Sequence, residues 1–208
     1  MNYSSVSGKS WISKDYNSEK ANFLKDNFNI SEILSKLIAI RNIKIEDVSF
    51  FLKPKIKNFL PNPFCLRDMD KAVQRSVEAL DKREKIGIFG DYDVDGATST
   101  AILGNYFTHL KHTIEIYIPD RKTEGYGPST KGFDKLITKG SKLIFTVDCG
   151  TLSFDTIEFS QNKSIDVIVL DHHQSESRLP KALSVVNPNR LDDESRLNYL
   201  CAAGVALC

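Results

Sequence analysis

Two patterns of apolar residues divide the chain into two regions. In the first region, apolar residues recur at helical spacing over 31–42 and 68–84, with Ser31 and Asp68 as candidate N-caps. The segment between them, "FFLKPKIKNFLPNPFCL", contains three prolines, so we expect an irregular connector there. We therefore predict a helical amino-terminal region over residues 1–84.

After this region, short apolar runs alternate with segments compatible with helices. Runs rich in β-branched and aromatic residues predict strands over 85–90, 113–118, 142–147 and 165–170, with a further strand over 183–187. Helices are expected over 97–110, 129–139 and 152–162. Strands that alternate with helices indicate βαβ units. Residues 85–208 are therefore predicted to form an α/β domain with a doubly wound parallel sheet.

The chain closes on "LNYLCAAGVALC", an apolar stretch typical of a buried helix. Neither a polar cap nor a glycine stop follows it. We expect it to lead into a further part of a longer core, so that the domain over 85–208 is incomplete. A helix that docks on a partner is the alternative.

Composition narrows the class of protein. The 208 residues include 28 Lys and Arg against 27 Asp and Glu, a net charge of +1, which excludes a strongly basic nucleic-acid binder but leaves a local basic groove open. The four cysteines show neither a CxxC pair nor zinc-like spacing, which indicates a reducing compartment. With neither an apolar signal segment nor a membrane-length apolar run, we expect a cytoplasmic protein without membrane partners.

Acidic residues and histidines follow three of the predicted strands. Asp91, Asp93 and Asp95 come after the first strand, Asp148 after the third, and the triplet 171–173, "DHH", after the fourth. The carboxyl ends of parallel strands lie along one edge of the sheet, where open α/β sheets bind their ligands. We therefore expect these side chains to converge on one site.

Carboxylates gathered so closely need a counter-charge. Two carboxylates about 4 Å apart repel by roughly 1 to 4 kcal/mol over the plausible range of dielectric. Oxygen ligands with one or two imidazoles suit Mn²⁺ or Mg²⁺, and the number of carboxylates favours two such ions bridged by one carboxylate, as in phosphoester hydrolases. An EF-hand is the competing interpretation of "DYDVDG", but its twelfth position, which should be Glu, is Ile102.

Residues beside the aspartates suggest an anion site. Gly96 permits a tight turn out of the strand, and "GATST" opens a helix whose free amides favour an anion. Thr98 and Ser99 could donate hydrogen bonds to a phosphate, with N-terminal capping as the alternative.

The two histidines are adjacent, which sets an expectation for their directions. In extended backbone, the side chains of His172 and His173 would point opposite ways. We expect one to ligate metal and the other to face substrate or a second carboxylate. Asp171 then suits an outer position in which it fixes an imidazole tautomer.

The segments "GDYDVDGATS", "TVDCGT" and "LDHH" resemble motifs I, II and III of the DHH phosphoesterase superfamily. Within it, "IPDRKTEGYGPS" and "VVNPNRLDDES" are similar to bacterial single-strand-specific 5′→3′ exonucleases, as are "SGKSWISK", "FLKPKIKNFLPNP" and "LRDMDKAV" nearer the start. The resemblance covers essentially the whole chain. It implies metal-dependent hydrolysis of single-stranded DNA from the 5′ end, in recombination and DNA repair.

The resemblance also implies roles for metal-binding residues at matching positions. Asp93 and Asp95 take ligand positions for two Mn²⁺ or Mg²⁺ ions, with Asp91 as their neighbour. Asp148 takes the bridging position between the two ions, where it also belongs to the catalytic set. His172 takes the place of a metal ligand.

Three further residues match positions that contact the substrate. The resemblance implies that His173 faces the scissile phosphate, that Arg121 grips the 5′-terminal phosphate, and that Tyr126 packs on a nucleobase. From the residues alone, two alternatives remain. Arg121 could form a surface salt bridge with Asp120 or Glu124, and Tyr126 could be an ordinary loop residue without a role in binding.

Parts of the family pattern are not found in these residues. A fourth motif with a further metal-binding aspartate, the second lobe and an oligonucleotide-binding domain would lie downstream, so we expect truncation before the second lobe and weak or no activity of this part alone. Single-strand-binding proteins or helicases are implied as partners by resemblance only. Rival functions are a phosphoesterase on small substrates (oligoribonucleotides, cyclic dinucleotides, 3′-phosphoadenosine phosphate) and a non-catalytic scaffold.

Overall fold

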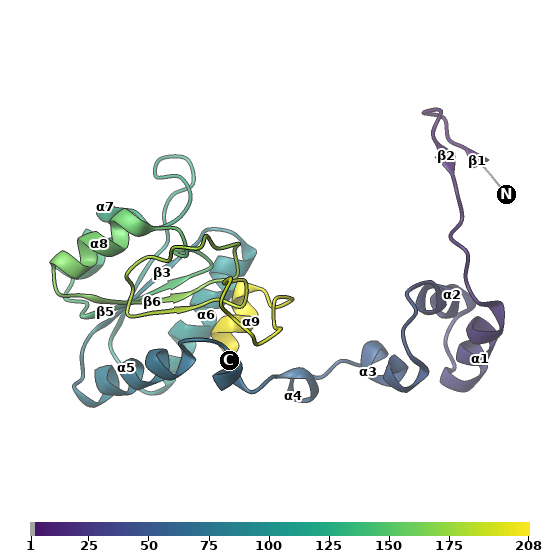
Figure 1. Ribbon diagram of the computed structural model, residues 1–208, viewed down its shortest axis with the longest axis horizontal. Coiled ribbons are helices and arrows are strands. Elements are labelled where there is room, and N and C mark those ends of the chain that lie inside the picture. The colour runs from purple at the N-terminus through teal and green to yellow at the C-terminus, as the bar shows by residue number, and fades with distance from the viewer. Residues whose placement is uncertain (1–2) are drawn as a thin grey trace. The chain divides into compact units, whose positions relative to one another are not determined.

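A parallel β-sheet organises the larger part of the molecule. The computed structural model describes residues 3–208, which divide into two compact units, one ending at Leu60 and the other running from Pro61 to Cys208. The sheet of the second unit has five strands in the order β4 (Ile114–Tyr117), β3 (Ile86–Gly90), β5 (Leu143–Val147), β6 (Asp166–Leu170) and β7 (Ser184–Val186) (Figure 1). All four neighbouring pairs are parallel. The predicted α/β class is confirmed, and each strand lies within one residue of its predicted bounds.

Helices cover both faces of this sheet, as the doubly wound prediction requires. They are η2 (Pro63–Cys65), α5 (Met69–Asp81), α6 (Val94–His109), α7 (Thr130–Thr138), α8 (Phe154–Asn162) and α9 (Ala202–Leu207). Helices α5, α6 and α9 pack on one face, and α7 and α8 pack on the other (Figure 1).

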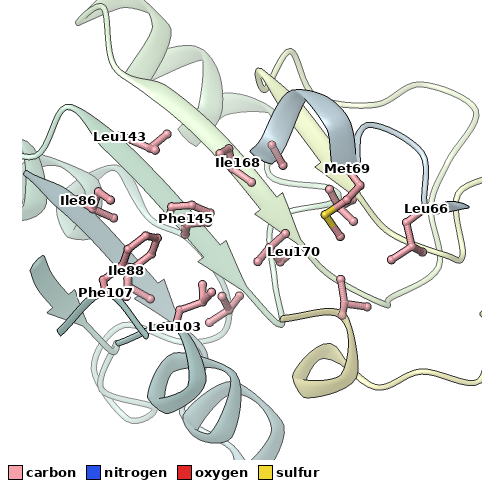
Figure 2. Close-up of a cluster of buried hydrophobic side chains, with 14 of the residues drawn as sticks. Leu66, Met69, Ile86, Ile88, Leu103, Phe107, Leu143, Phe145, Ile168 and Leu170 are labelled. Carbon is pink, nitrogen blue, oxygen red and sulfur yellow. The ribbon is translucent and has the colours of Figure 1, made fainter. Parts of the chain in front are cut away.

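Alternate residues of each central strand enter two separate cores. In β5, Leu143 and Phe145 face the core shared with α5, α6 and α9 (Figure 2), whereas Ile144 packs with Phe133 of α7 and Ile157 of α8. All five side chains are buried. Burial on both faces explains why the strand segments are continuously apolar in the sequence.

The amino-terminal unit is built around a helical pair. Helices α1 (Ser18–Phe28) and α2 (Glu32–Ile40) enclose a small core with Leu24 and Ile38 fully buried. The side chain of Ser31 accepts a hydrogen bond from the Leu34 N–H at 3.3 Å, which confirms it as an N-cap. The short elements of this unit are β1 (Tyr3–Ser4), β2 (Ser10–Trp11), η1 (Ile45–Asp47), α3 (Val48–Leu52) and α4 (Ile56–Phe59).

The division between the units differs from the boundary predicted at residue 84. Helix α5 was assigned to the helical lead-in, but its buried side chains, including Met69, pack on the sheet. Asp68 also departs from its predicted role as an N-cap, because its backbone is left-handed (φ 62°) and its side chain makes no capping bond. Its carboxylate instead pairs with Lys71 at 2.6 Å and Arg190 at 2.5 Å. No helix in the described part of the chain is long and apolar enough to cross a lipid bilayer.

Arg190 ties the start of α5 to the segment that follows β7. Its guanidinium is buried, and Nη1 donates to Asp68 and to the carbonyl of Val185 at 2.6 Å. Nε and Nη2 donate to the two carboxylate oxygens of Asp192, each at 2.8 Å. A bidentate pair with further hydrogen bonds is the geometry in which a buried charge is tolerated.

We predict that Arg190→Ala lowers the free energy of unfolding by about 3–5 kcal/mol, because the partly buried carboxylate of Asp68 loses its buried partner. Arg67→Ala is the matched control, since Arg67 pairs with Asp192 on the surface and should contribute less than about 1 kcal/mol. Urea unfolding measures both values. Equal losses in the two variants would show that the Arg190 contacts do not hold the unit together.

Candidate metal centre

The register of the sheet aligns four polar residues at its carboxyl edge. The paired last residues of neighbouring strands are Gly90, Val147, Leu170 and Val186. The residues that follow them are Asp91, Asp148, Asp171 and Asn187. All four are buried, with at most 2% of their surface exposed. Because β4 lies on one side of β3 and β5 on the other, the first two stand at the switch point of the sheet, where ligands bind in open α/β folds.

The turn into α6 brings a further aspartate to this edge. Asp93 caps α6 by accepting the Gly96 N–H at 2.9 Å, and this hydrogen bond lowers the pKa of the Asp93 carboxyl. A Cβ on Gly96 would lie 2.5 Å from the carbonyl oxygen of Asp91. The helix therefore starts against the strand end only because residue 96 is glycine. The sequence had suggested a tight turn at Gly96, but the close approach is what requires it.

Two groups of potential ligands share Asp148. Within each group the ligand atoms lie within 4.8 Å of one another: Asp91, Asp93 and Asp148 form one group, and Asp148, His172 and His173 form the other. Among the described residues, Oδ1 of Asp91 and Oδ1 of Asp148 are buried without a hydrogen-bond partner. Unpartnered carboxylate oxygens beside imidazoles are a donor set that fits Mn²⁺ or Mg²⁺.

The electrostatics of Asp148 support a site that needs a cation. Burial, followed by the neighbouring carboxylates of Asp93 and Asp95, raises the pKa of Asp148 to about 8. Burial also raises the pKa of Asp91. Without a positive charge beside it, Asp148 retains its proton at neutral pH. Asp148 also has a left-handed backbone (φ 61°), a conformation that Asp and Asn tolerate better than most residues.

Asp171 is fully paired, unlike the two unpartnered acids. Its carboxylate accepts hydrogen bonds from the N–H and hydroxyl of Thr151, from the N–H groups of His172 and His173, and from Nδ1 of His173 at 2.7 Å. Burial raises the pKa of Asp171, but these hydrogen bonds outweigh it and lower the pKa to about 2. The hydrogen bond that Nδ1 of His173 donates to Asp171 in turn raises the pKa of His173. Asp171 thus occupies the outer position that the sequence suggested.

The two histidines lie together rather than on opposite sides. Their ring centroids are 4.8 Å apart, so the expectation of opposite directions was wrong. The strand ends at Leu170, and the alternation of an extended backbone no longer applies beyond it. Nε2 of His172 lies 3.3 Å from Oδ1 of Asp148 and 3.5 Å from Oδ2 of Asp95.

Asp95 has a role that the sequence did not suggest. Its two carboxylate oxygens accept the N–H groups of Ala202 and Ala203, each at 2.8 Å, at the start of α9. Among the described residues, it belongs to neither group of candidate ligands. The sequence predicts Asp95 as a metal ligand; the structure places it beside His172, with its oxygens engaged by a helix terminus.

Arg121 and Tyr126 flank the cluster. The Arg121 guanidinium lies 5.4 Å from the centre of the Tyr92 ring, and its charge opposes the burial that raises the pKa of Asp91. The Tyr126 hydroxyl donates to the backbone carbonyl of Asp148 at 3.2 Å and lies 3.3 Å from Nε2 of His173, while its ring remains 57% exposed.

The alternative partners of Arg121 are engaged elsewhere. Asp120 accepts the backbone N–H groups of Lys122 and Thr123, and Glu124 accepts the hydroxyl of Tyr117. Within the described residues no ion pair joins Arg121 to either acid, which leaves its guanidinium at the mouth of the cluster.

The hydroxyls proposed to contact phosphate are used within α6. Thr98 donates to the carbonyl of Val94 at 2.6 Å, and Ser99 donates to the carbonyl of Asp95 at 2.7 Å. Ser99 is also completely buried, so it is not available to a ligand, and its assignment as a substrate contact is corrected. Both side chains follow the common tendency of helical hydroxyls to bond the carbonyl four residues earlier.

Sequence reasoning missed Thr151, Asn187 and Asn189. Asn187 ends the row at the sheet edge, and its side chain donates to the Thr151 hydroxyl and to the carbonyl of His173. A signal was present, because Asn187 follows its strand as the acids follow theirs. It was overlooked because an amide carries no charge.

The profile of the DHH family, N-terminal domain, matches residues 85–207. The chain belongs to the DHH family. The match spans the five strands and the cluster at their carboxyl edge, so the site described above is that of a DHH domain.

Two curated relatives share one name. A single-stranded-DNA-specific exonuclease RecJ of Bacillus subtilis is 32% identical over 94% of this chain and 25% of its own length. The protein of the same name from Haemophilus influenzae is 40% identical over 70% of this chain and 25% of its own length. The chain thus spans about a quarter of the length of these relatives.

Solved structures agree on the fold of the DHH domain. An exonuclease RecJ bound to manganese is 33% identical, with a TM-score of 0.62, over 68% of this chain and 36% of that one. RecJ of Thermus thermophilus in complex with Mn²⁺ has a TM-score of 0.66 over 90% of this chain and 26% of that one, and at 24% identity it supports the fold alone.

In the metal-free DHH domain, Asp148→Asn is expected to stabilise the fold at high pH. A carboxyl whose folded pKa of about 8 exceeds its ordinary value of 3.8 weakens the fold as pH rises through that window. Asn cannot ionise, and its amide can donate to Asp93. Thermal unfolding in EDTA should give the variant a higher Tm than wild type at pH 9, with the two values converging at pH 4.

Asp171→Asn is the control of opposite sign. A folded pKa of about 2, below the ordinary 3.8, means that the ionised carboxylate contributes stability above pH 4 and loses it as pH falls toward 2. This variant should therefore have a lower Tm than wild type at pH 7. Stabilisation by both substitutions, or by neither, would contradict the account of the buried charges.

Gly96→Ala should destabilise the fold by about 1–3 kcal/mol and weaken Mn²⁺ binding, since its methyl group would displace the Asp91 backbone. Gly104→Ala, in the same helix, meets only the flexible end of Ile116 at 3.3 Å and should be neutral or stabilising by up to about 1 kcal/mol. Urea unfolding and calorimetry with Mn²⁺ measure the two effects. A Gly96 variant with wild-type affinity would refute the close approach as the determinant of the site.

Proposed function

We propose that this DHH domain is the catalytic part of a metal-dependent nuclease that removes nucleotides from the 5′ end of single-stranded DNA. The observation that carries the proposal is the buried Asp148, shared by two groups of ligands and left with an unpartnered oxygen. The names of the similar proteins support the reaction and the substrate.

The two groups suggest which residues would hold a pair of divalent cations. Asp91, Asp93 and Asp148 would hold one ion, and Asp148 and His172 would hold the other, with Asp95 beside His172. Bound Mn²⁺ or Mg²⁺ would supply Lewis-acid stabilisation of the phosphoryl oxygens and a water of lowered pKa. The burial of Asp91 and Asp148 strengthens their hold on cations.

His173 would act on the charge that develops at the phosphate. Its Nδ1 donates to Asp171, which favours the imidazolium form and leaves Nε2 on the opposite side of the ring, near the Tyr126 hydroxyl. In its protonated form the ring would present Nε2–H as a preorganised donor to negative charge on a phosphoryl oxygen in the transition state.

Residues at the mouth of the cluster suit a single strand. Arg121 presents a guanidinium that can bind a terminal phosphate in bidentate fashion, and the exposed ring of Tyr126 can stack on any base. Single-strand-binding proteins or helicases as partners, and a cytoplasmic location, belong to the same proposal through the resemblance to bacterial repair nucleases.

Metal binding is tested by calorimetry on this chain with Mn²⁺. Asp148→Ala should reduce the affinity at least tenfold, because it removes the shared ligand. Asp166→Ala is the matched control, since Asp166 begins β6 at the opposite edge of the sheet and pairs with Arg75. Wild-type protein without measurable Mn²⁺ binding would favour a non-catalytic scaffold.

Hydrolysis is tested with 5′-labelled DNA and a protein of the relatives' length that carries these residues. We expect Mn²⁺-dependent shortening of single strands and little cleavage of duplex. Asp148→Ala should abolish the cleavage. Oligoribonucleotides and cyclic dinucleotides serve as competing substrates. Faster cleavage of these small substrates than of long single strands would replace the proposed substrate and retain the chemistry.

A further inference from the structure

Asn187 completes the buried row at the sheet edge. Its Nδ2 donates to the hydroxyl of Thr151 at 2.8 Å and to the carbonyl of His173 at 2.9 Å, while its Oδ1 accepts the N–H of Asn189 at 2.8 Å. The reverse orientation of the amide would set an NH₂ group against that N–H, so the donors and acceptor are fixed. The side chain is completely buried and fully satisfied.

These contacts determine which atom is the donor in each hydrogen bond between Asn187, Thr151, Asp171 and His173. Because Asn187 donates to the Thr151 oxygen, the single hydroxyl hydrogen of Thr151 is free to go to Asp171, at 2.6 Å. The same carboxylate accepts Nδ1–H of His173. The chain of bonds therefore places the proton of His173 on Nδ1 and fixes the plane of its ring.

A second amide holds the neighbouring histidine. The side-chain amide of Asn189 donates to the carbonyl of His172. The N–H groups of both histidines donate to Asp171 at 2.8 and 3.2 Å. The backbone of the histidine pair is thus held on its N–H side by a carboxylate and on its carbonyl side by two asparagines.

We propose that Asn187 is a positioning residue for His173 and that Asn189 serves His172 in the same way. Neither side chain touches a candidate ligand atom; each acts through the backbone of a histidine and, for Asn187, also through Thr151 and Asp171. The inference rests on the proposed function, because it assigns these asparagines to the same site. Removing Asn187 leaves the Thr151 hydroxyl and the His173 carbonyl without donors, so the imidazole loses its fixed tautomer.

The test is ¹⁵N NMR of the histidine rings in the metal-free chain, which contains only four histidines. At alkaline pH, where the imidazole is neutral, wild-type His173 should show Nδ1 and Nε2 as separate, unaveraged resonances. In Asn187→Ala they should collapse toward the averaged values of a mobile imidazole, and the affinity for Mn²⁺ should fall by about 10- to 100-fold. Asn189→Ala, at a less buried position, should alter the signals of His172 and leave the Nδ1 proton of His173 in place.

Val185→Ala is the control for general loosening. Val185 is buried on β7, two residues before Asn187, and its side chain packs with α7 and α8. It should lower the Tm without moving either histidine. Wild-type ring signals in Asn187→Ala, or the same changes in the Val185 variant, would overturn the proposal.

The ring signals and the metal titration separate this inference from the proposed function. If wild type shows the fixed tautomer but binds no Mn²⁺, the function fails and the positioning role stands. If wild type binds Mn²⁺ and the Asn187 variant keeps both its affinity and its ring signals, the positioning role fails and the function stands. Should Asn187→Ala not fold, the response of His172 to Asn189→Ala decides between the same outcomes.

Discussion

The burial of three carboxylates side by side at one sheet edge is the constraint on which the site depends. Asp171 meets it with five hydrogen-bond donors, whereas Asp91 and Asp148 each keep an oxygen without a partner. Burying an uncompensated charge costs several kcal/mol, so such acids either hold protons or bind cations. The same edge thus contains one carboxylate that is satisfied by hydrogen bonds from Thr151 and the two histidines, and two carboxylates that each have an unpartnered oxygen.

The fold can hold these carboxylates in place because the strands that lead to them are buried on both faces. Two apolar cores fix the register of β3, β5, β6 and β7. The residues that directly follow these strands therefore fall into one row. A slip of one residue in any strand would exchange its core side chains and move its terminal acid out of the row. The precision of the site is therefore a consequence of sheet register, reinforced at Gly96 by the contact between helix and strand.

Much of the fold could be predicted from the sequence, since strand and helix periodicity are local and the convergence of strand ends follows from parallel topology. What could not be predicted depends on distant partners. Asp95 binds Ala202, 107 residues later, and Asp68 binds Arg190, 122 residues later, so neither shows its role in its own surroundings. The sequence alone does not show whether a hydroxyl near the start of a helix faces solvent or the core, which is why the prediction for Ser99 was wrong. Asn187 lacks the charge by which the acids of the same row stand out in the sequence.

The clamp between Asp95 and α9 has a consequence for how the domain behaves as a whole. Helix α9 has only six residues, and Cys201, at its N-cap position, makes no side-chain cap. Its start is instead held by a carboxylate that belongs to the acidic rim. Fraying of this helix would release the Asp95 carboxylate beside His172, so hydrogen exchange at the Ala202 amide would act as a remote gauge of events at the sheet edge.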